Sequence, residues 1–264
     1  LYIGQGCSNA SEILRKVAKK NNIPVTTTIH GLGIFDETDD LSLKFVGMHG
    51  SVYANKAVQE SDCIIAIGSR FDDRTIGNLE YYAPNAIKAS KENRGGIIHC
   101  NINGKELNNI VNVDYAIKAD CGVFLNKILD LIEINKREDW LSIINKWKNK
   151  YTFKSLNCNN NNINSQDVII ELNKQTPNKE DYIFTSGVGN HQMFAAQFID
   201  WRHPKSFISS GSLGVMGFGL PSAIGASIAK PEKTVIDIDG DGSFLMTMSD
   251  MKTAKQYDLK NLKV

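Results

Sequence analysis

Short apolar runs that end in glycine or aspartate alternate along this chain with patterns typical of helices. The run CIIAIGS at 63–69 is β-branched and apolar throughout, as expected for a strand buried on both faces. A helical pattern precedes it at 52–60. Parallel strands need a crossover connection, usually a helix, so this alternation predicts parallel sheets covered by helices on both faces. The predicted fold class is α/β.

The same criteria locate the remaining elements. We expect strands at 1–4, 23–28, 63–69, 96–103, 115–120, 181–187, 206–211 and 234–239. We expect helices at 11–20, 52–60, 123–132, 137–150, 167–175, 190–198, 220–229 and after Ser243. Trp140 and Trp147 are seven residues apart, which places them on one face of the helix at 137–150.

An Asn-rich segment, NCNNNNINSQ at 157–166, separates two such α/β patterns. Its composition buries little apolar surface and is typical of a surface linker. We therefore expect one domain at 1–135, a helix with the Asn-rich linker at 136–165, and a second domain at 166–264. The chain of 264 residues is long enough for both.

The net charge of +1 gives no bias towards nucleic acid or anionic membranes. No apolar run approaches the ~20 residues of a membrane-spanning helix. The chain opens inside an apparent strand and stops abruptly at NLKV, so we expect both ends to continue in a longer protein. The cysteines lack a C-x-x-C spacing, and we expect them to be reduced, small buried residues: Cys7, Cys63, Cys100, Cys121 and Cys158.

The segment DIDGDGSF at 237–244 places acids and glycines directly after a strand. Ligands of parallel sheets bind at the carboxyl ends of strands, and glycines allow close backbone approach. Asp241 is a hard oxygen ligand suited to Mg²⁺ shared with phosphate. Ser243 is expected to cap the following helix. A turn with solvated acids explains this octapeptide equally well.

Two further glycine-rich turns follow strands in the second half. TSGVGNHQM at 185–193 offers Asn190, His191 and Gln192, and SSGSLGVMGFG at 209–219 surrounds Met216 with glycines. Taken singly, a structural histidine and a packed loop are the more common explanations. Three such turns at one sheet edge favour a cofactor site.

The first half has weaker candidates. GQGCSNA at 4–10 is not a complete G-x-G-x-x-G. GSRFDDR at 68–74 brings Arg70 and Arg74 to a strand end, where arginine can bind phosphate. A surface cluster of ion pairs with Asp72 and Asp73 is an equally good explanation. Asp120 suits either a ribose contact or a helix N-cap.

Long motifs give the chain a resemblance to a known family. PVTTTIHGLGIFDE, GMHGSVYANKAVQESDCIIAIGSRFDDR, GVGNHQM, SLGVMGFGLPSAIGA and IDIDGDGSF occur in the order found in acetohydroxyacid synthases, also called acetolactate synthases. The resemblance covers nearly the whole chain, and RGGIIH is closest to the fungal type. It implies an FAD-binding, Rossmann-like middle domain followed by most of a thiamine-diphosphate-binding domain.

The resemblance also implies roles for individual residues of the second half. Asp241 matches the acid that binds Mg²⁺. A bulky Met216 forces thiamine diphosphate into a bent form. Met216, Asn190, His191 and Arg74 match catalytic positions. The expected contacts to thiamine diphosphate are Val188, Gly189, Asn190, His191, Gly214, Met216, Asp241, Gly242 and Ser243.

In the first half, the resemblance implies a structural FAD without net redox chemistry. The matching positions are Gly4, Gln5, Gly6, Thr28, Ile29, Met48, His49, Gly68, Arg70, Asp72, Arg74, Asn101, Ile102 and Asp120.

The chain departs from the family pattern at two positions. Asn190 replaces a glutamine and is one methylene shorter, and Ser212 replaces a glycine. The glutamate that activates the aminopyrimidine from a neighbouring subunit and an Asn-Asn that completes the metal site are both expected outside these residues. We therefore expect residues 1–264 to be inactive alone.

The implied substrates are pyruvate and 2-oxobutyrate, in branched-chain amino-acid synthesis. A homodimer or homotetramer, a small regulatory subunit and a mitochondrial location follow from the fungal-like resemblance, with cytoplasm or plastid as other options. Two alternatives stay open: a related carboligase or oxidase, of the pyruvate oxidase or glyoxylate carboligase type, and a non-catalytic nucleotide-binding module.

Overall fold

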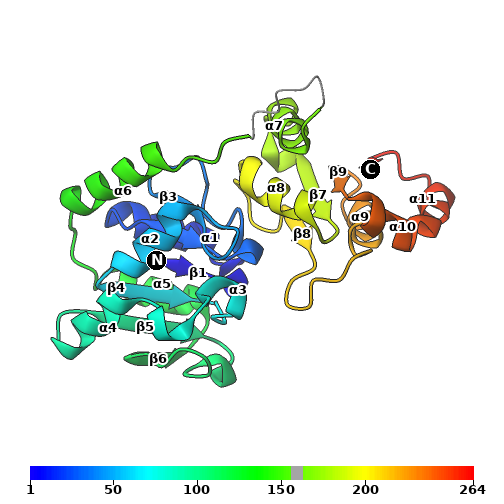
Figure 1. Ribbon diagram of the computed structural model, residues 1–264. Coiled ribbons are helices and arrows are strands. Elements are labelled where there is room, and N and C mark those ends of the chain that lie inside the picture. Colours follow the sequence, from blue (N-terminus) through cyan, green and yellow to red (C-terminus); the bar gives the residue numbers. More distant parts are fainter. Residues whose placement is uncertain (156–162) are drawn as a thin grey trace. The chain divides into compact units, whose positions relative to one another are not determined.

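The computed structural model describes residues 1–155 and 163–264 (Figure 1). These residues form two compact units, Leu1–Thr152 and Phe153–Val264. Each unit contains one parallel sheet, which confirms the predicted α/β class. Most of the linker expected at 157–166, with Cys158, lies outside the described residues.

The sheet of unit 1 has the order β3-β2-β1-β4-β5-β6, with every pair parallel. The strand order reverses between β1 and β4, as in doubly wound sheets that bind dinucleotides at this switch point. The strands are β1 (Tyr2–Ile3), β2 (Val25–Thr27), β3 (Ser42–Phe45), β4 (Cys63–Ile67), β5 (Gly96–Asn101) and β6 (Tyr115–Lys118).

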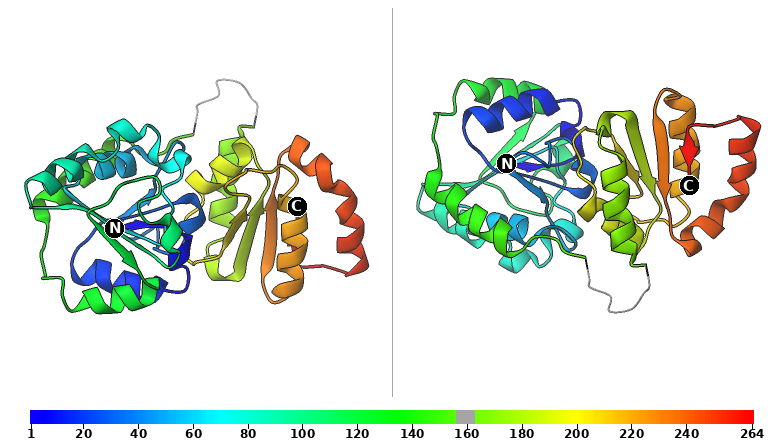
Figure 2. Two further views of the ribbon diagram at one scale, coloured as in Figure 1. Left: turned by 90° about the horizontal axis from the view of Figure 1, so that it is seen from below. Right: turned by 90° about the horizontal axis from the view of Figure 1, so that it is seen from above.

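Helices cover both faces of this sheet (Figure 2). Neighbouring strand residues therefore enter different cores: Tyr2 lies in one cluster and Ile3 in the other. One face carries α1 (Ser11–Lys20) and α5 (Cys121–Leu129), and the other carries α2 (Val52–Glu60) and α4 (Pro84–Lys91). The short helix α3 (Asp73–Ile76) follows β4.

Helix α6 (Glu138–Lys150), expected in the segment between the domains, packs against α2 of unit 1. Ile144 is buried in the same core as α2. The rings of Trp140 and Trp147 contact each other edge to face, with centroids 5.7 Å apart. The prediction that they share one helix face is confirmed.

The sheet of unit 2 has the order β10-β9-β7-β8, again parallel. Helix α9 packs on one face, and α7 and α8 pack against each other (Figure 2). The strands are β7 (Tyr182–Ser186), β8 (Phe207–Ser209), β9 (Thr234–Ile238) and β10 (Leu262–Lys263). The helices are α7 (Ser165–Gln175), α8 (Asn190–Phe198), α9 (Gly219–Ala229), α10 (Asp241–Thr247) and α11 (Met251–Gln256).

Two short strands were not predicted. Strand β3 contains Lys44 at φ 58°, outside the extended region, so it is a short and irregular strand. Strand β10 has two residues and depends on pairing with β9. Helix α5 begins at Cys121, two residues before the expected start, and ends at Leu129, three residues before the expected end.

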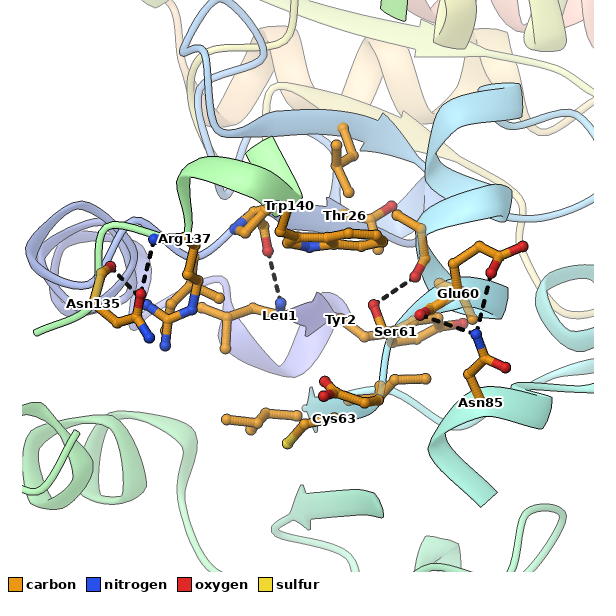
Figure 3. A pocket seen from close by; sticks show the side chains of 18 of the residues that line it. Leu1, Tyr2, Thr26, Glu60, Ser61, Cys63, Asn85, Asn135, Arg137 and Trp140 are labelled. Atoms are coloured by element: carbon orange, nitrogen blue, oxygen red, sulfur yellow. Dashed lines mark hydrogen bonds between the residues drawn. The ribbon is translucent and has the colours of Figure 1, made fainter. Parts of the chain in front are cut away.

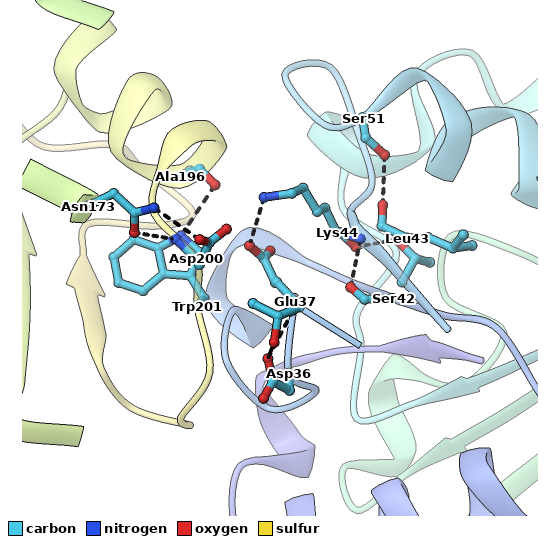
Figure 4. Close-up of polar contacts among 12 residues, drawn as sticks. Asp36, Glu37, Ser42, Leu43, Lys44, Ser51, Asn173, Ala196, Asp200 and Trp201 are labelled. Carbon is cyan, nitrogen blue, oxygen red and sulfur yellow. Dashed lines mark hydrogen bonds and ion pairs between the residues drawn. The ribbon is translucent and has the colours of Figure 1, made fainter. Parts of the chain in front are cut away.

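Polar contacts hold a loop in each unit (Figure 4). In unit 1, Lys44 Nζ lies 3.3 Å from Glu37 Oε2, which compensates a buried carboxylate. In unit 2, Trp201 Nε1 donates to the Ala196 carbonyl at 3.3 Å. Both contacts satisfy groups whose burial without a partner would be destabilising.

Cys7, Cys100 and Cys121 are buried free thiols, as expected, whereas Cys63 is exposed. Cys63 opens β4 at the edge of the apolar run, and this position explains the wrong prediction of burial. In the described parts of the chain, no helix has the length and apolar character needed to cross a membrane.

Candidate cofactor sites

Three turns of unit 2 meet at one edge of its sheet, as predicted. They follow β7, β8 and β9, which are adjacent and parallel, so their carboxyl ends coincide. A Cβ added at Gly242 would lie 3.2 Å from Met216 Cε, and one at Gly214 would lie 3.7 Å from Val188 Cγ1. The three turns therefore form one surface.

Ser243 connects two of these turns and does not cap a helix. Helix α10 begins at Asp241 with Gly240 as its N-cap, so the predicted start after Ser243 and the predicted cap are both wrong. Ser243 Oγ accepts a hydrogen bond from the Gly217 N–H at 2.9 Å. Thr247 Oγ1 donates to the Gly217 carbonyl at 3.1 Å. Both hydroxyls hold the glycine-rich loop after β8 against α10.

His191 and Asp239 form a buried pair beneath this surface. His191 Nε2 lies 3.3 Å from Asp239 Oδ1, and their side chains are 17% and 2% exposed. Burial lowers the pKa of His191, and the Asp239 charge opposes this shift. Sequence reasoning assigned no chemistry to Asp239, although its place two residues before Asp241 was a signal.

A second buried carboxylate, that of Asp237, lies two residues earlier, within β9. Thr185 Oγ1 donates to Asp237 Oδ1 at 2.7 Å, and burial raises the pKa of Asp237 to about 6. The Oδ2 atoms of Asp237 and Asp239 are buried without a hydrogen-bond partner. These atoms mark a polar pocket whose hydrogen bonds are incomplete without further groups.

Asp241 is exposed at the first position of α10. Within the described ranges, no group of three or more His, Cys, Asp or Glu could hold a metal ion. One carboxylate is nevertheless a common protein contribution to Mg²⁺ when phosphate and water supply the other oxygens. The glycine-lined surface, the orphaned carboxylate oxygens and Asp241 thus fit a metal–diphosphate group.

The remaining predicted residues of unit 2 surround this surface. Asn190 is exposed at the start of α8, and the Met216 side chain is 40% exposed. Gln192, offered by the sequence beside Asn190 and His191, donates to Ser209 Oγ at 2.6 Å and joins the turn after β7 to β8.

The switch point of unit 1 is built from close-packed glycine backbone. A Cβ at Gly4 would collide with the Gly68 carbonyl, and one at Gly6 would lie 2.8 Å from Gly68 Cα. Gly6 N–H donates to the Gly68 carbonyl at 3.1 Å. Gly68 has φ +63°, a conformation that favours glycine. This edge suits a ligand that approaches main-chain groups closely.

The other residues predicted for FAD lie at or just after the carboxyl ends of the same strands. Their placement at one edge of the sheet is confirmed, whereas their contacts to FAD stay a prediction. Met48 and Ile102 are large exposed apolar side chains there. Met48 N–H donates to the Arg74 carbonyl at 2.8 Å. The set comprises Gly4, Gln5, Gly6, Thr28, Ile29, Met48, His49, Gly68, Arg70, Asp72, Arg74, Asn101, Ile102 and Asp120.

Asp120 was expected either to contact a ribose or to cap a helix, and Arg74 either to bind phosphate or to form surface ion pairs. Asp120 Oδ1 accepts from the N–H groups of Gly122 at 2.8 Å and Val123 at 3.1 Å, so Asp120 is the N-cap of α5. Arg74 Nε lies 4.0 Å from Asp73 Oδ2, and both side chains are largely exposed. Such a pair contributes little to stability.

His30 is a residue of this edge that sequence reasoning did not select. Burial is the main cause of its lowered pKa, and the Arg70 charge adds to the shift. The half-buried imidazole therefore lies within electrostatic reach of Arg70. Its position just after β2 was the available signal.

A cavity of about 720 Å³ in unit 1 lies away from this edge (Figure 3). Its walls include Leu1, Pro24 and Cys63, at the amino ends of strands, and Trp140. None of the predicted site residues is among its described lining. The size of a cavity is therefore no guide to the candidate site at the glycine-rich edge.

Comparison with protein families identifies the class of cofactor that a domain like unit 2 binds. Residues 1–128 match the central domain of thiamine pyrophosphate enzymes, and residues 187–264 match their C-terminal TPP binding domain. The chain belongs to the thiamine pyrophosphate enzymes. Thiamine pyrophosphate is another name for thiamine diphosphate, so the expected cofactor class of unit 2 is confirmed.

Individual relatives confirm the resemblance to acetolactate synthases. The chain is 45% identical over 262 residues to "Acetolactate synthase catalytic subunit, mitochondrial" of Saccharomyces cerevisiae. It is 49% identical over 253 residues to "Acetolactate synthase, mitochondrial" of Schizosaccharomyces pombe. These alignments cover 97% and 94% of this chain but only 38% of each relative. The large subunit of Buchnera aphidicola is 42% identical, with 44% of its length covered.

Proposed function

We propose that this chain is part of an acetolactate synthase catalytic subunit. The enzyme would decarboxylate pyruvate and transfer the hydroxyethyl unit to pyruvate or 2-oxobutyrate. The observation that carries this proposal is the convergence of the three glycine-rich turns of unit 2, in a chain 45% identical to a yeast catalytic subunit. The pyruvate oxidase and glyoxylate carboligase alternatives gain no support from these relatives.

Unit 2 would hold thiamine diphosphate at the edge formed by the turns after β7, β8 and β9. Asp241 would supply a charged oxygen to Mg²⁺, and the turn containing Gly189 would bind the diphosphate. Met216 would give the cofactor an apolar support, because its methyl group lies over Gly242. Bound thiamine diphosphate supplies the electron sink for decarboxylation and carbon–carbon bond formation.

Unit 1 would bind FAD at the switch point of its sheet. The backbones of Gly4, Gly6 and Gly68 pack directly against one another at this point, because none of them carries a side chain. Arg70 would bind phosphate through its exposed guanidinium. FAD would stabilise the fold without taking part in redox chemistry.

The intact enzyme would be a homodimer or homotetramer with a small regulatory subunit. The name of the S. cerevisiae relative, a catalytic subunit, supports a second kind of subunit. A mitochondrial location is supported by the fungal relatives. Chloroplastic relatives at about 40% identity keep the plastid as the main competing compartment.

The decisive experiment measures cofactor binding and products in the full-length protein. Mg²⁺ with thiamine diphosphate should raise the melting temperature, and Asp241→Ala should abolish this rise because the metal loses its charged ligand. Acetolactate from pyruvate, and acetohydroxybutyrate when 2-oxobutyrate is added, should appear. A protein that binds the cofactor but yields neither product would favour a different carboligase. An unchanged melting temperature would favour a non-catalytic module.

A further inference from the structure

The imidazole of His191 and the carboxylate of Asp239 occupy a slot walled by glycines. A Cβ at Gly189 would lie 2.8 Å from His191 Cε1, and one at Gly240 would lie 2.8 Å from His191 Nδ1. On the other side, a Cβ at Gly187 would collide with Asp239 Oδ1. Any larger residue at these positions would displace the ring or the carboxylate. The three glycines therefore make room for this particular pair.

The pair joins two turns that are distant in sequence. His191 lies in the first turn of α8, after β7, whereas Asp239 directly follows β9. Asp239 Oδ1 accepts from the Gly240 N–H at 3.1 Å and lies 3.3 Å from His191 Nε2. A carboxylate excluded from water needs such polar neighbours, because burial of an uncompensated charge is costly. The imidazole is thus held between Asp239 and the backbone that leads into α10.

We propose that Asp239 is a positioning residue that orients the His191 ring and, through it, fixes the turn after β7 against the turn after β9. The inference rests on the proposed function, because these turns carry the residues assigned to the diphosphate of thiamine diphosphate. Carboxylates orient imidazoles in this way in many metal sites, where loss of the outer carboxylate weakens binding 10–100-fold. Asp239 acts on the cofactor only through His191.

The test is a double-mutant cycle on cofactor affinity in the full-length protein. Asp239→Ala and His191→Ala should each raise the Kd of thiamine diphosphate, with Mg²⁺ present, about tenfold. The double variant should be no weaker than either single variant, because both remove the same contact. Asp239→Asn keeps an oxygen in the place of Oδ1, close to Nε2, and should restore most of the affinity.

Asp237→Asn is the matched control, because Asp237 is a buried carboxylate two residues before Asp239 but bonds to Thr185. Its effect on the Kd should multiply with that of His191→Ala. Multiplying effects of Asp239→Ala and His191→Ala would overturn the inference, as would unchanged affinity. If Asp239→Ala does not fold, the cycle is run with Asp239→Ser, which also removes the carboxylate, and His191→Gln. A wild-type protein that does not bind thiamine diphosphate would instead overturn the proposed function.

Discussion

Ser212 has a backbone conformation that favours glycine, although the residue is a serine. It has φ 57°, in the left-handed region that favours glycine, within the loop after β8. The resemblance to acetolactate synthases implies glycine at this position. The chain therefore tolerates backbone strain in a loop that carries proposed cofactor contacts.

Ser212→Gly should increase the free energy of unfolding by about 0.5–1 kcal/mol, because relief of the left-handed strain outweighs the added freedom of the unfolded chain. Urea unfolding measures the change. Ser212→Ala is the control, since it retains a Cβ in the same conformation and should give no gain. Equal stability of the glycine and alanine variants would show that the backbone is unstrained.

Asp237 gives the protein a pH-dependent stability. Burial raises its pKa from the ordinary aspartate value of 3.8 to about 6, so the native state keeps a proton that the unfolded chain releases. Stability should therefore fall as the pH rises from about 4 to 6. Asp237→Asn cannot ionise and should be more stable than wild type at pH 7 by about 1–2 kcal/mol, with no such gain at pH 4.

Urea unfolding of both proteins at pH 4 and pH 7 measures this difference. The amide oxygen of asparagine can still accept from Thr185, so the hydrogen bond is retained in the variant. Parallel pH profiles of the two proteins would contradict the assigned pKa shift.

At the scale of elements, the end of α7 depends on a buried cation. Lys179 Nζ donates to the Asn173 carbonyl at 2.8 Å and to Thr176 Oγ1 at 2.9 Å. Burial lowers the pKa of Lys179 to about 8. The ammonium satisfies groups that the last turn of a helix leaves without partners.

Lys179→Met keeps the length of the side chain but removes its donors. We expect the free energy of unfolding to fall by about 1–2 kcal/mol, because buried acceptors lose their hydrogen bonds. Lys174→Met, within α7, is the control: Lys174 pairs with Glu171 on the surface and should contribute less than about 0.5 kcal/mol. Similar losses in both variants would contradict a specific capping role for Lys179.

At the scale of the whole molecule, the two units have separate sheets and separate cores. The two clusters of unit 1 contain no residue of unit 2. A unit with its own sheet and core is able to fold alone.

Residues 1–152 expressed alone should therefore unfold cooperatively, and FAD should raise their melting temperature while thiamine diphosphate should not. Differential scanning calorimetry with each cofactor measures both effects. A shift caused by thiamine diphosphate would contradict the assignment of this cofactor to unit 2.

Sequence patterns alone predicted the α/β class, most of the strands and helices, and the turns that carry the candidate site. These features are local, because period, β-branching and glycine-rich turns are visible within about ten residues. Family motifs then supplied the chemistry expected of Asp241 and Met216. Strands β3 and β10 were missed because their local signals are weak.

The order of the strands, with its reversal between β1 and β4, and the partners of the polar side chains could be seen only in the folded protein. Ser243 was assigned to a local cap but bonds to Gly217, and Asp239 was left without a role but lies beside His191. Both contacts join turns that are brought together only by strand pairing. Hydrogen bonds and burial between such segments depend on where the sheet places them, which no short stretch of sequence encodes.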